Sequence, residues 1–324
     1  MNAVERAHDS ESHQSPAEPP PRVTIRDVAT VCGVSQSTVS FVLNEVPDQT
    51  ISKATRERVR NAARELGYVP NGIARALMEG SSRVVVLNLE RAREGEYTQN
   101  FIRGLDKELA LYGFTLLVRH GPAAATDIEH VESVIKPRAV IRLGEPYLTG
   151  HEYDDAGGGW RNGMASHVLL QLRYLAEHGH RHILFAFPEG EPLAQVRLRF
   201  ASEVAALLEL PDVVPIELPL GEASVRAILT AVRLAHPAIT AVAAFDDLTA
   251  LCLLAAMREL GLSAPADLAV IGYDESPLGE LSTPALTTIR LDAEGHGRVE
   301  ARRALGLAGA FATEPGRVIE RESV

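Results

Sequence analysis

From residue 84 onward, short apolar runs rich in β-branched residues alternate with longer amphipathic segments. The runs include 84–90, 139–144 and 268–274, and 248–261 is one of the amphipathic segments between them. Strands that alternate with helices form parallel sheets covered by helices on both faces. About eight strands are more than a typical single sheet holds and fit two lobes. The sequence therefore predicts a doubly wound α/β core with two lobes over residues 81–324.

Residues 22–69 predict a separate all-α unit of three short helices. Thr24, Ser35 and Ser52 are each placed to cap a helix, and the segment after each one repeats apolar residues three or four apart. Gly33 stands between the first two helices, where a sharp reversal favours a residue that tolerates positive φ. Two helices joined in this way form a helix-turn-helix unit.

Residues 70–80 predict a further short helix, because Ile73 and Leu77 lie four apart after Pro70. A helix of this length has marginal stability in isolation. It therefore either packs on another surface or forms when a partner binds. Residues 1–21 are rich in Pro, Ser and Glu and lack an apolar segment. They predict a disordered tail and not a secretory signal.

Three stretches resemble the LacI/GalR family of transcriptional regulators. VTIRDVATVCGVSQSTVSFVLN (23–44) resembles its DNA-binding headpiece, and ISKATRERVRNAARELGYVPNGIARAL (51–77) resembles its third helix and hinge helix. FDDLTALCLLAAMRELGLSAPADLAVIGYDESPLGELSTPALTTIRLD (245–292) resembles its effector-binding core. The resemblance implies a two-lobed core like that of periplasmic binding proteins. It also implies a homodimer that binds a pseudo-palindromic operator in double-stranded DNA, most often as a repressor.

The predicted second helix carries the candidate base contacts. Helix-turn-helix proteins place the N-terminal residues of this helix against base edges, where Gln36 and Ser37 stand. A glutamine can form two hydrogen bonds with adenine. The short polar side chains around them suit phosphate oxygens, and Phe41, where the family usually has arginine, suits an apolar contact. The candidate phosphate contacts are Thr24, Ser35, Thr38, Ser40 and Asn44.

The alternative is that Ser35 only caps the helix and Gln36 is only solvated. Charge favours the DNA interpretation, because residues 22–80 carry eight Arg and Lys against six Asp and Glu. The chain as a whole has a formal charge of -11.

The resemblance also implies that the hinge helices of two subunits pair in the minor groove. Leu77 would insert at the central base step, with Asn71 and Ala74 beside it. The alternative is that Ile73 and Leu77 dock on the core.

Polar side chains follow the predicted strands at the end where a small ligand would bind between two lobes. Asp246 follows one strand, Asp274 follows another, and Arg197 follows a third after a loop. Carboxylates and a guanidinium suit a polyol, because hydroxyls both donate and accept hydrogen bonds. We therefore predict a small-molecule effector, a sugar or related metabolite, and no cofactor.

Each effector contact has an alternative. Arg199 competes with Arg197, and Asp274 could be a turn residue. Tyr273 and Trp160 could stack on a sugar ring or belong to the core, and Asp247 is expected to cap the helix that follows it.

Other classes of protein fit the sequence less well. The sequence has neither an ordered Ser, His and Asp set nor a phosphate loop, and either pattern would have predicted an enzyme. His178, His180 and His182 lack a nearby cysteine or acidic ligand, so we predict no metal site. A periplasmic-type sugar receptor without a DNA role shares the predicted core, but the helix-turn-helix unit and the lack of a signal peptide argue against it. With two cysteines far apart, the sequence predicts a cytoplasmic protein.

Overall fold

The computed structural model describes residues 23–44, 49–68, 80–89, 95–120, 125–144, 160, 163–219, 222–307 and 312–324. The chain divides into two compact units, Met1–Arg75 and Ala76–Val324. Among the described residues, no helix is both long and apolar enough to cross a membrane.

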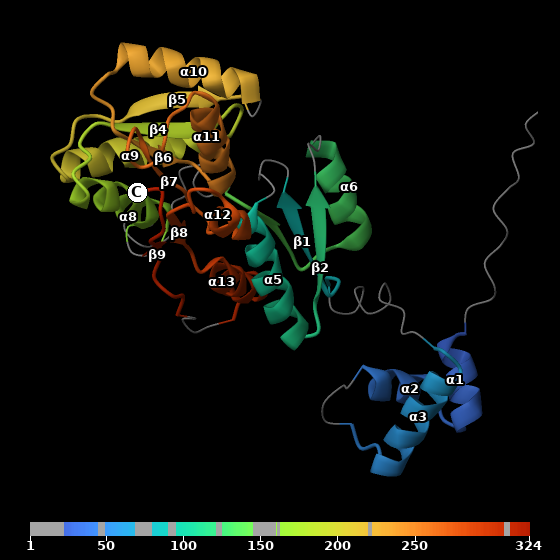
Figure 1. Cartoon of the computed structure of the whole chain (residues 1–324). Coiled ribbons are helices and arrows are strands. Elements are labelled where there is room, and N and C mark those ends of the chain that lie inside the picture. The colour runs from blue at the N-terminus through green and yellow to red at the C-terminus, as the bar shows by residue number, and fades with distance from the viewer. Residues whose placement is uncertain are drawn as a thin grey trace, which may run out of the picture. The chain divides into compact units, whose positions relative to one another are not determined.

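The first unit contains the three predicted helices, α1 (Ile25–Cys32), α2 (Gln36–Leu43) and α3 (Lys53–Glu65) (Figure 1). The Asp27 carboxylate accepts hydrogen bonds from the backbone N–H and the hydroxyl of Thr24, both at 2.7 Å, which fixes the start of α1.

Serine side chains cap the other two helices. Ser35 accepts from the Thr38 N–H at 3.1 Å, and Ser52 accepts from the Thr55 N–H at 3.2 Å. Gly33 ends α1 with φ 65°, so the turn between α1 and α2 does use the left-handed conformation.

One apolar side from each helix builds the core of this unit. Val28, Val39 and Val59 are fully buried at its centre, one from each helix. The spacing of apolar residues in the sequence predicted these faces, so the amphipathic interpretation is confirmed.

The first lobe of the second unit has a three-stranded parallel sheet in the order β2-β1-β3. Its strands are β1 (Val84–Leu89), β2 (Thr115–His120) and β3 (Ala139–Arg142). Its helices are α5 (Glu96–Leu111), α6 (Ala125–Ile135) and α13 (Ala293–Leu305), the last of which comes from near the end of the chain.

The second lobe has a four-stranded parallel sheet in the order β5-β4-β6-β7. Its strands are β4 (Ile183–Pro188), β5 (Val214–Leu218), β6 (Ala241–Ala244) and β7 (Ala269–Ile271). Two apolar clusters cover its two faces, which is why β4 and β6 are buried throughout.

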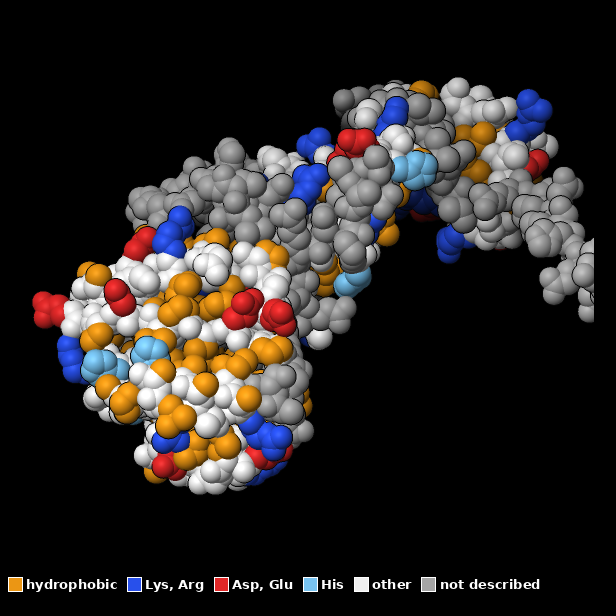
Figure 2. Space-filling model, turned by 90° about the horizontal axis from the view of Figure 1, so that it is seen from above, with side chains coloured by type: hydrophobic (Ala, Val, Ile, Leu, Met, Phe, Trp, Pro, Cys, Tyr) orange, Lys and Arg blue, Asp and Glu red, His pale blue; other side chains and the backbone are white. Residues whose placement is uncertain are grey.

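Helices cover both faces of this sheet. One face packs against α8 (Met164–Glu177) and α9 (Ala194–Leu207), and the other against α10 (Glu222–Ala235) and α11 (Asp247–Glu259). The short α12 (Pro277–Leu281) follows β7. Figure 2 shows exposed hydrophobic side chains among charged ones on the side of this lobe that carries α10. The predicted doubly wound, two-lobed α/β core is confirmed.

An antiparallel pair of strands, β8 (Thr288–Arg290) and β9 (Arg317–Ile319), links the two lobes. In the sequence, one strand precedes α13 and the other follows it. α13 crosses α5 so closely that glycines replace side chains at the contact. A Cβ at Gly104 would lie 1.9 Å from the Glu294 carbonyl oxygen, and one at Gly297 would lie 2.1 Å from that of Phe101.

An ion-pair cluster closes the same helix pair. The Glu108 carboxylate, only 2% exposed, accepts hydrogen bonds from Arg298 Nε and Arg302 Nη1, each at 3.0 Å. A buried carboxylate with two guanidinium partners resists separation of α5 from α13. The C-terminal helix is therefore an integral part of the first lobe.

Candidate functional site

The start of α2 presents a polar edge above an apolar underside. Gln36 and Ser37 are exposed, whereas Val39 and Val42 of the same helix are buried. The Ser35 hydroxyl lies 2.9 Å from the Thr38 hydroxyl, so both side chains help fix the first turn. The helix start is therefore held in place without using Gln36 or Ser37.

The remaining described DNA-contact candidates lie at the start of α1 and along α2. Thr24 is exposed next to α1, Phe41 is half-buried, and Asn44 Nδ2 donates to Ser40 Oγ at 3.1 Å at the end of α2. The hinge candidates Asn71, Ala74 and Leu77 lie outside the described residues.

In the second unit, Arg197 lies at the centre of the candidate effector site. It is 2% exposed, and its guanidinium lies 3.8 Å from the centre of the Tyr273 ring and 4.6 Å from that of Phe245. It donates one hydrogen bond to the Phe245 carbonyl oxygen, while its Nε has no hydrogen-bond partner. Burial lowers the pKa of Arg197, and the nearby Tyr273 and Asp274 oppose that shift.

Of the two competing arginines, Arg197 is the one that lies beside the acidic side chains. Arg199 is exposed and lies 3.9 Å from Glu203 of its own helix. A buried glutamine further orients Arg197: Gln171 Nε2 donates to the carbonyl oxygens of Ala244 and Gly272 at 2.8 and 3.1 Å. Its Oε1 accepts from Arg197 Nη2 at 3.5 Å.

Asp274 lies where the two lobes meet. Its φ of 100° is unusual for a residue with a side chain, which is typical of a functional position. Its Oδ2 would be 3.9 Å from a Cβ at Gly95, so the carboxylate lies next to the start of α5 in the other lobe. Burial raises the pKa of Asp274 well above its ordinary value; Arg197 opposes this shift, and Asp246, Asp247 and Glu96 add to it.

The helix cap expected of Asp247 is provided by the aspartate that precedes it. Asp246, not Asp247, caps α11: its Oδ1 accepts from the Thr249 N–H at 2.7 Å. The prediction that Asp247 caps this helix is therefore wrong, because Asp246 has the extended backbone that an N-cap requires.

Asp247 instead holds the loop that carries Asp274. It is 2% exposed and accepts hydrogen bonds from the Tyr273 N–H at 2.7 Å and the Ser276 N–H at 2.6 Å. Burial raises the pKa of Asp247 to about 6, although its hydrogen bonds to Thr288, Ser276 and Tyr273 act in the opposite direction.

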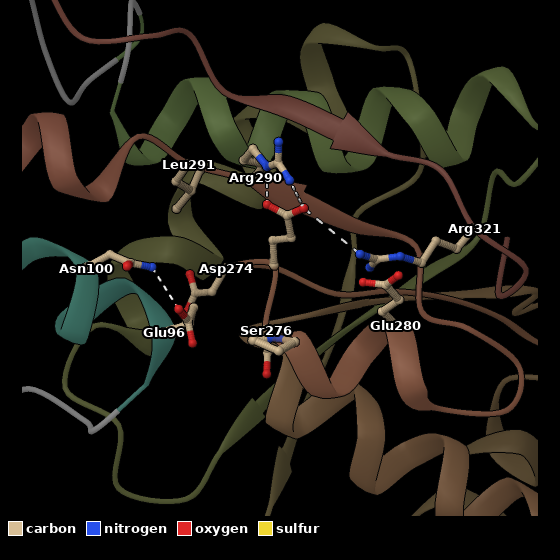
Figure 3. A pocket seen from close by; sticks show the side chains of 10 residues that line it. Glu96, Asn100, Asp274, Ser276, Glu280, Arg290, Leu291 and Arg321 are labelled. Carbon is tan, nitrogen blue, oxygen red and sulfur yellow. Dashed lines mark hydrogen bonds and ion pairs between the residues drawn. The ribbon is translucent and has the colours of Figure 1, made fainter.

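A cavity of about 420 Å³ opens beside Asp274 (Figure 3). Its lining comes from both lobes: Glu96 and Asn100 belong to α5, whereas Glu280 and Arg321 belong to the second lobe and the C-terminal segment. Of the four predicted effector contacts only Asp274 lines this cavity. Arg197 and Tyr273 are instead buried against one another, and Asp246 is half-buried at the start of α11. Glu96 and Asn100 were missed by sequence reasoning, since they stand on a helix and do not follow a strand.

Tyr273 is part of a buried contact between the lobes. It is 8% exposed, and its hydroxyl lies 3.3 Å from His167 Nδ1, while the Tyr97 hydroxyl lies 3.3 Å from His296 Nδ1. The two imidazole rings are 6.2 Å apart. The Arg197 guanidinium covers one face of the Tyr273 ring, so this ring helps to hold Arg197 in place.

Two other sequence candidates have structural roles. Trp160 packs on the core of the second lobe, with its ring 6.3 Å from that of Phe200. His178 Nδ1 lies 2.8 Å from the Tyr174 carbonyl oxygen, and His180 Nδ1 lies 2.9 Å from Thr240 Oγ1. Across the part of the chain that the structure describes, no three His, Cys, Asp or Glu side chains form a group that could hold a metal ion.

Comparison with known proteins assigns each unit to a family model. Residues 24–71 match the model of bacterial regulatory proteins of the lacI family, and residues 172–324 match a periplasmic binding protein-like domain.

Known relatives match over most of this chain. The chain is 31% identical to the HTH-type transcriptional repressor PurR of Erwinia tasmaniensis, over 84% of this chain and 86% of that protein. It is 29% identical to the HTH-type transcriptional regulator CelR of Thermobifida fusca, over 92% and 95%. The fold is similar to the lac repressor dimer bound to operator and the anti-inducer ONPF, with a TM-score of 0.74 and 22% identity over 94% of this chain and 99% of that one.

Proposed function

The chain belongs to the lacI family of bacterial regulatory proteins, and from this we propose that it is a transcriptional repressor whose hold on its operator is set by a small metabolite. The single observation that carries the proposal is the polar start of α2, where Gln36 and Ser37 are exposed beside a helix cap. The proposal assigns no catalytic step to the chain. A repressor acts on the chromosome, so it also implies a cytoplasmic protein.

Base reading is assigned to Gln36 and Ser37 and phosphate contact to the surrounding side chains. A glutamine at the first position of a recognition helix can form two hydrogen bonds with an adenine in the major groove. Phe41 would offer an apolar contact, suited to a thymine methyl group. The phosphate contacts are Thr24, Ser35, Thr38, Ser40 and Asn44.

The operator is expected to be pseudo-palindromic, because two subunits related by a two-fold axis read two half-sites. Exposed leucines support a homodimer: Leu278 is 59% exposed and Leu281 is 79% exposed on α12. Between the half-sites, Leu77 of each subunit would insert into the minor groove, with Asn71 and Ala74 alongside.

The effector is assigned to the cavity beside Asp274, with Arg197, Asp246 and Tyr273 as the polar groups next to Asp274. The cavity is lined from both lobes, so a ligand there can favour one angle between them. It can change DNA affinity only if it binds one arrangement better than the other. A polyol such as a sugar suits this mixture of carboxylates and a guanidinium.

A periplasmic-type receptor without a DNA role is the alternative, and the matched helix-turn-helix unit disfavours it. The deciding experiment selects duplexes from a random pool with full-length protein and then measures affinity by fluorescence anisotropy. We expect a palindromic consensus, and loss of this binding when residues 1–75 are removed.

Two variants test the assigned contacts on the selected duplex and on a random one. Gln36→Ala should cost about 1–3 kcal/mol on the selected duplex and relax one base position. Leu77→Ala should likewise weaken selected DNA more than random DNA. Gln195→Ala, at an exposed position on α9, is the matched control. No enrichment of any duplex, or undiminished binding after the deletion, would contradict the proposal.

A further inference from the structure

We propose that the effector carries a protonated amine as well as hydroxyl groups, as an amino sugar does, and that the amine binds between Glu96 of the first lobe and Asp274 of the second. This inference rests on the proposed effector site and names the chemical class of its ligand.

The first ground is that two carboxylates from different lobes face one another across the cavity. Figure 3 shows Glu96 and Asp274 side by side, and both line the cavity. The Asp274 carboxylate also lies against Gly95, the residue just before α5. Two like charges at one site repel in low dielectric, so this pair disfavours ionisation of both carboxyl groups while no cation lies between them.

The second ground is that the half-buried Asp274 side chain has no hydrogen-bond donor among the described residues. Glu96 is held in place, because its Oε1 accepts from Asn100 Nδ2 at 2.9 Å on the same helix. A buried carboxylate without a donor is costly, and a donor that a ligand brings offsets this cost.

The third ground is that the nearby cations are engaged elsewhere. Arg290 donates both of its hydrogen bonds to the two oxygens of Glu275, and Arg321 Nη1 donates to the Leu286 carbonyl oxygen at 2.7 Å. Arg197, which is covered by the Tyr273 ring, does not line the cavity and offsets the charge of Asp274 only in part. The part of the cavity between Glu96 and Asp274 therefore has an excess of acidic groups that a neutral sugar would leave without a counter-charge.

An ammonium group fits this excess better than a metal ion does. It donates up to three hydrogen bonds and carries one charge, which suits two carboxylates and an adjacent hydroxyl or amide. A divalent ion would require more ligands than the two facing carboxylates, and no group of three forms among the described residues. Because the amine would contact both lobes, its binding would draw them together.

The test uses full-length protein and matched sugars. Isothermal titration compares D-glucosamine, D-galactosamine and D-mannosamine with the corresponding neutral sugars and with their N-acetyl derivatives, in which the amine is uncharged. We expect an amino sugar to bind most tightly, at least about tenfold better than its N-acetyl form. Glu96→Gln should weaken that amino sugar by about tenfold and leave the neutral sugars unchanged. Glu177→Gln, an exposed carboxylate of α8, should alter neither.

Three results would overturn the inference: a neutral or N-acetyl sugar that binds as tightly as the best amino sugar, no binding of any amino sugar, or an amino sugar that binds Glu96→Gln unchanged. Operator binding is measured on the same samples. A neutral ligand that alters operator affinity would defeat the amine but support the proposed regulator. An amino sugar that binds to a protein with no preference for any DNA site would support the amine site and defeat the proposed regulator.

Discussion

His167 is held uncharged where the two lobes meet. Burial, followed by the nearby His296 and Arg197, lowers its pKa from 6.5 to about 3. A histidine whose pKa falls on folding binds its proton more readily in the unfolded chain. Its contribution to stability is therefore complete above pH 6.5 and is lost as the pH falls from there toward 3.

Replacing His167 should reduce the loss of unfolding free energy that occurs as the pH falls. Between pH 7 and pH 5 the free energy of unfolding of the wild type should fall by about 2 kcal/mol more than that of His167→Gln. Urea denaturation at several pH values measures both slopes. The exposed His236→Gln serves as the control and should keep the wild-type slope. Parallel profiles for wild type and His167→Gln would refute this assignment.

The adjacent aspartates show what a sequence can and cannot predict at this scale. The pattern of a strand followed by acidic residues located both side chains near the cleft. It could not say which one caps α11, because the choice depends on the backbone angles of Asp246 and on donors from residues 273 and 276. Nothing in the sequence indicated that Glu96 lines the cavity, because this depends on α5 of the first lobe lying beside Asp274 of the second.

The crossing of α5 and α13 depends on the absence of side chains. A Cβ at Gly297 would meet backbone atoms of Phe101 and Leu105, which cannot turn aside as a side chain can. We expect Gly297→Ala to lower the free energy of unfolding by about 1–3 kcal/mol through overpacking. Ala110→Ser, on the exposed side of α5, should change it by less than about 0.5 kcal/mol. Chemical denaturation decides, and an unchanged midpoint for Gly297→Ala would mean that the two helices can move apart.

Several boundaries of helices and strands differ from those that the sequence predicted. The apolar run 268–274, for example, forms a strand only at β7 (Ala269–Ile271), and its last residue, Asp274, has a φ of 100° that no strand adopts. The strand β5 gives only a weak signal in the sequence, since it contains Pro215 and alternates polar with apolar residues. It lies at the edge of its sheet, where a missing N–H is tolerated.

At the scale of the whole molecule, the two units have separate hydrophobic cores. The core of the helix-turn-helix unit draws only on residues between Ile25 and Tyr68, and the lobes have their own clusters. We expect removal of residues 1–75 to leave the main calorimetric transition within about 2 °C of its position in the full chain. A shift of more than about 5 °C would mean that the units stabilise one another.

The position of α13 also bears on how the protein is made. The first lobe contains β1 to β3, yet its core is completed by Ala301, and its glycine contact by Gly297. During synthesis the helix-turn-helix unit can therefore fold as soon as it leaves the ribosome, whereas the first lobe must wait until α13 has been made. A truncated mRNA that ends before α13 would yield a folded helix-turn-helix unit attached to an incomplete first lobe.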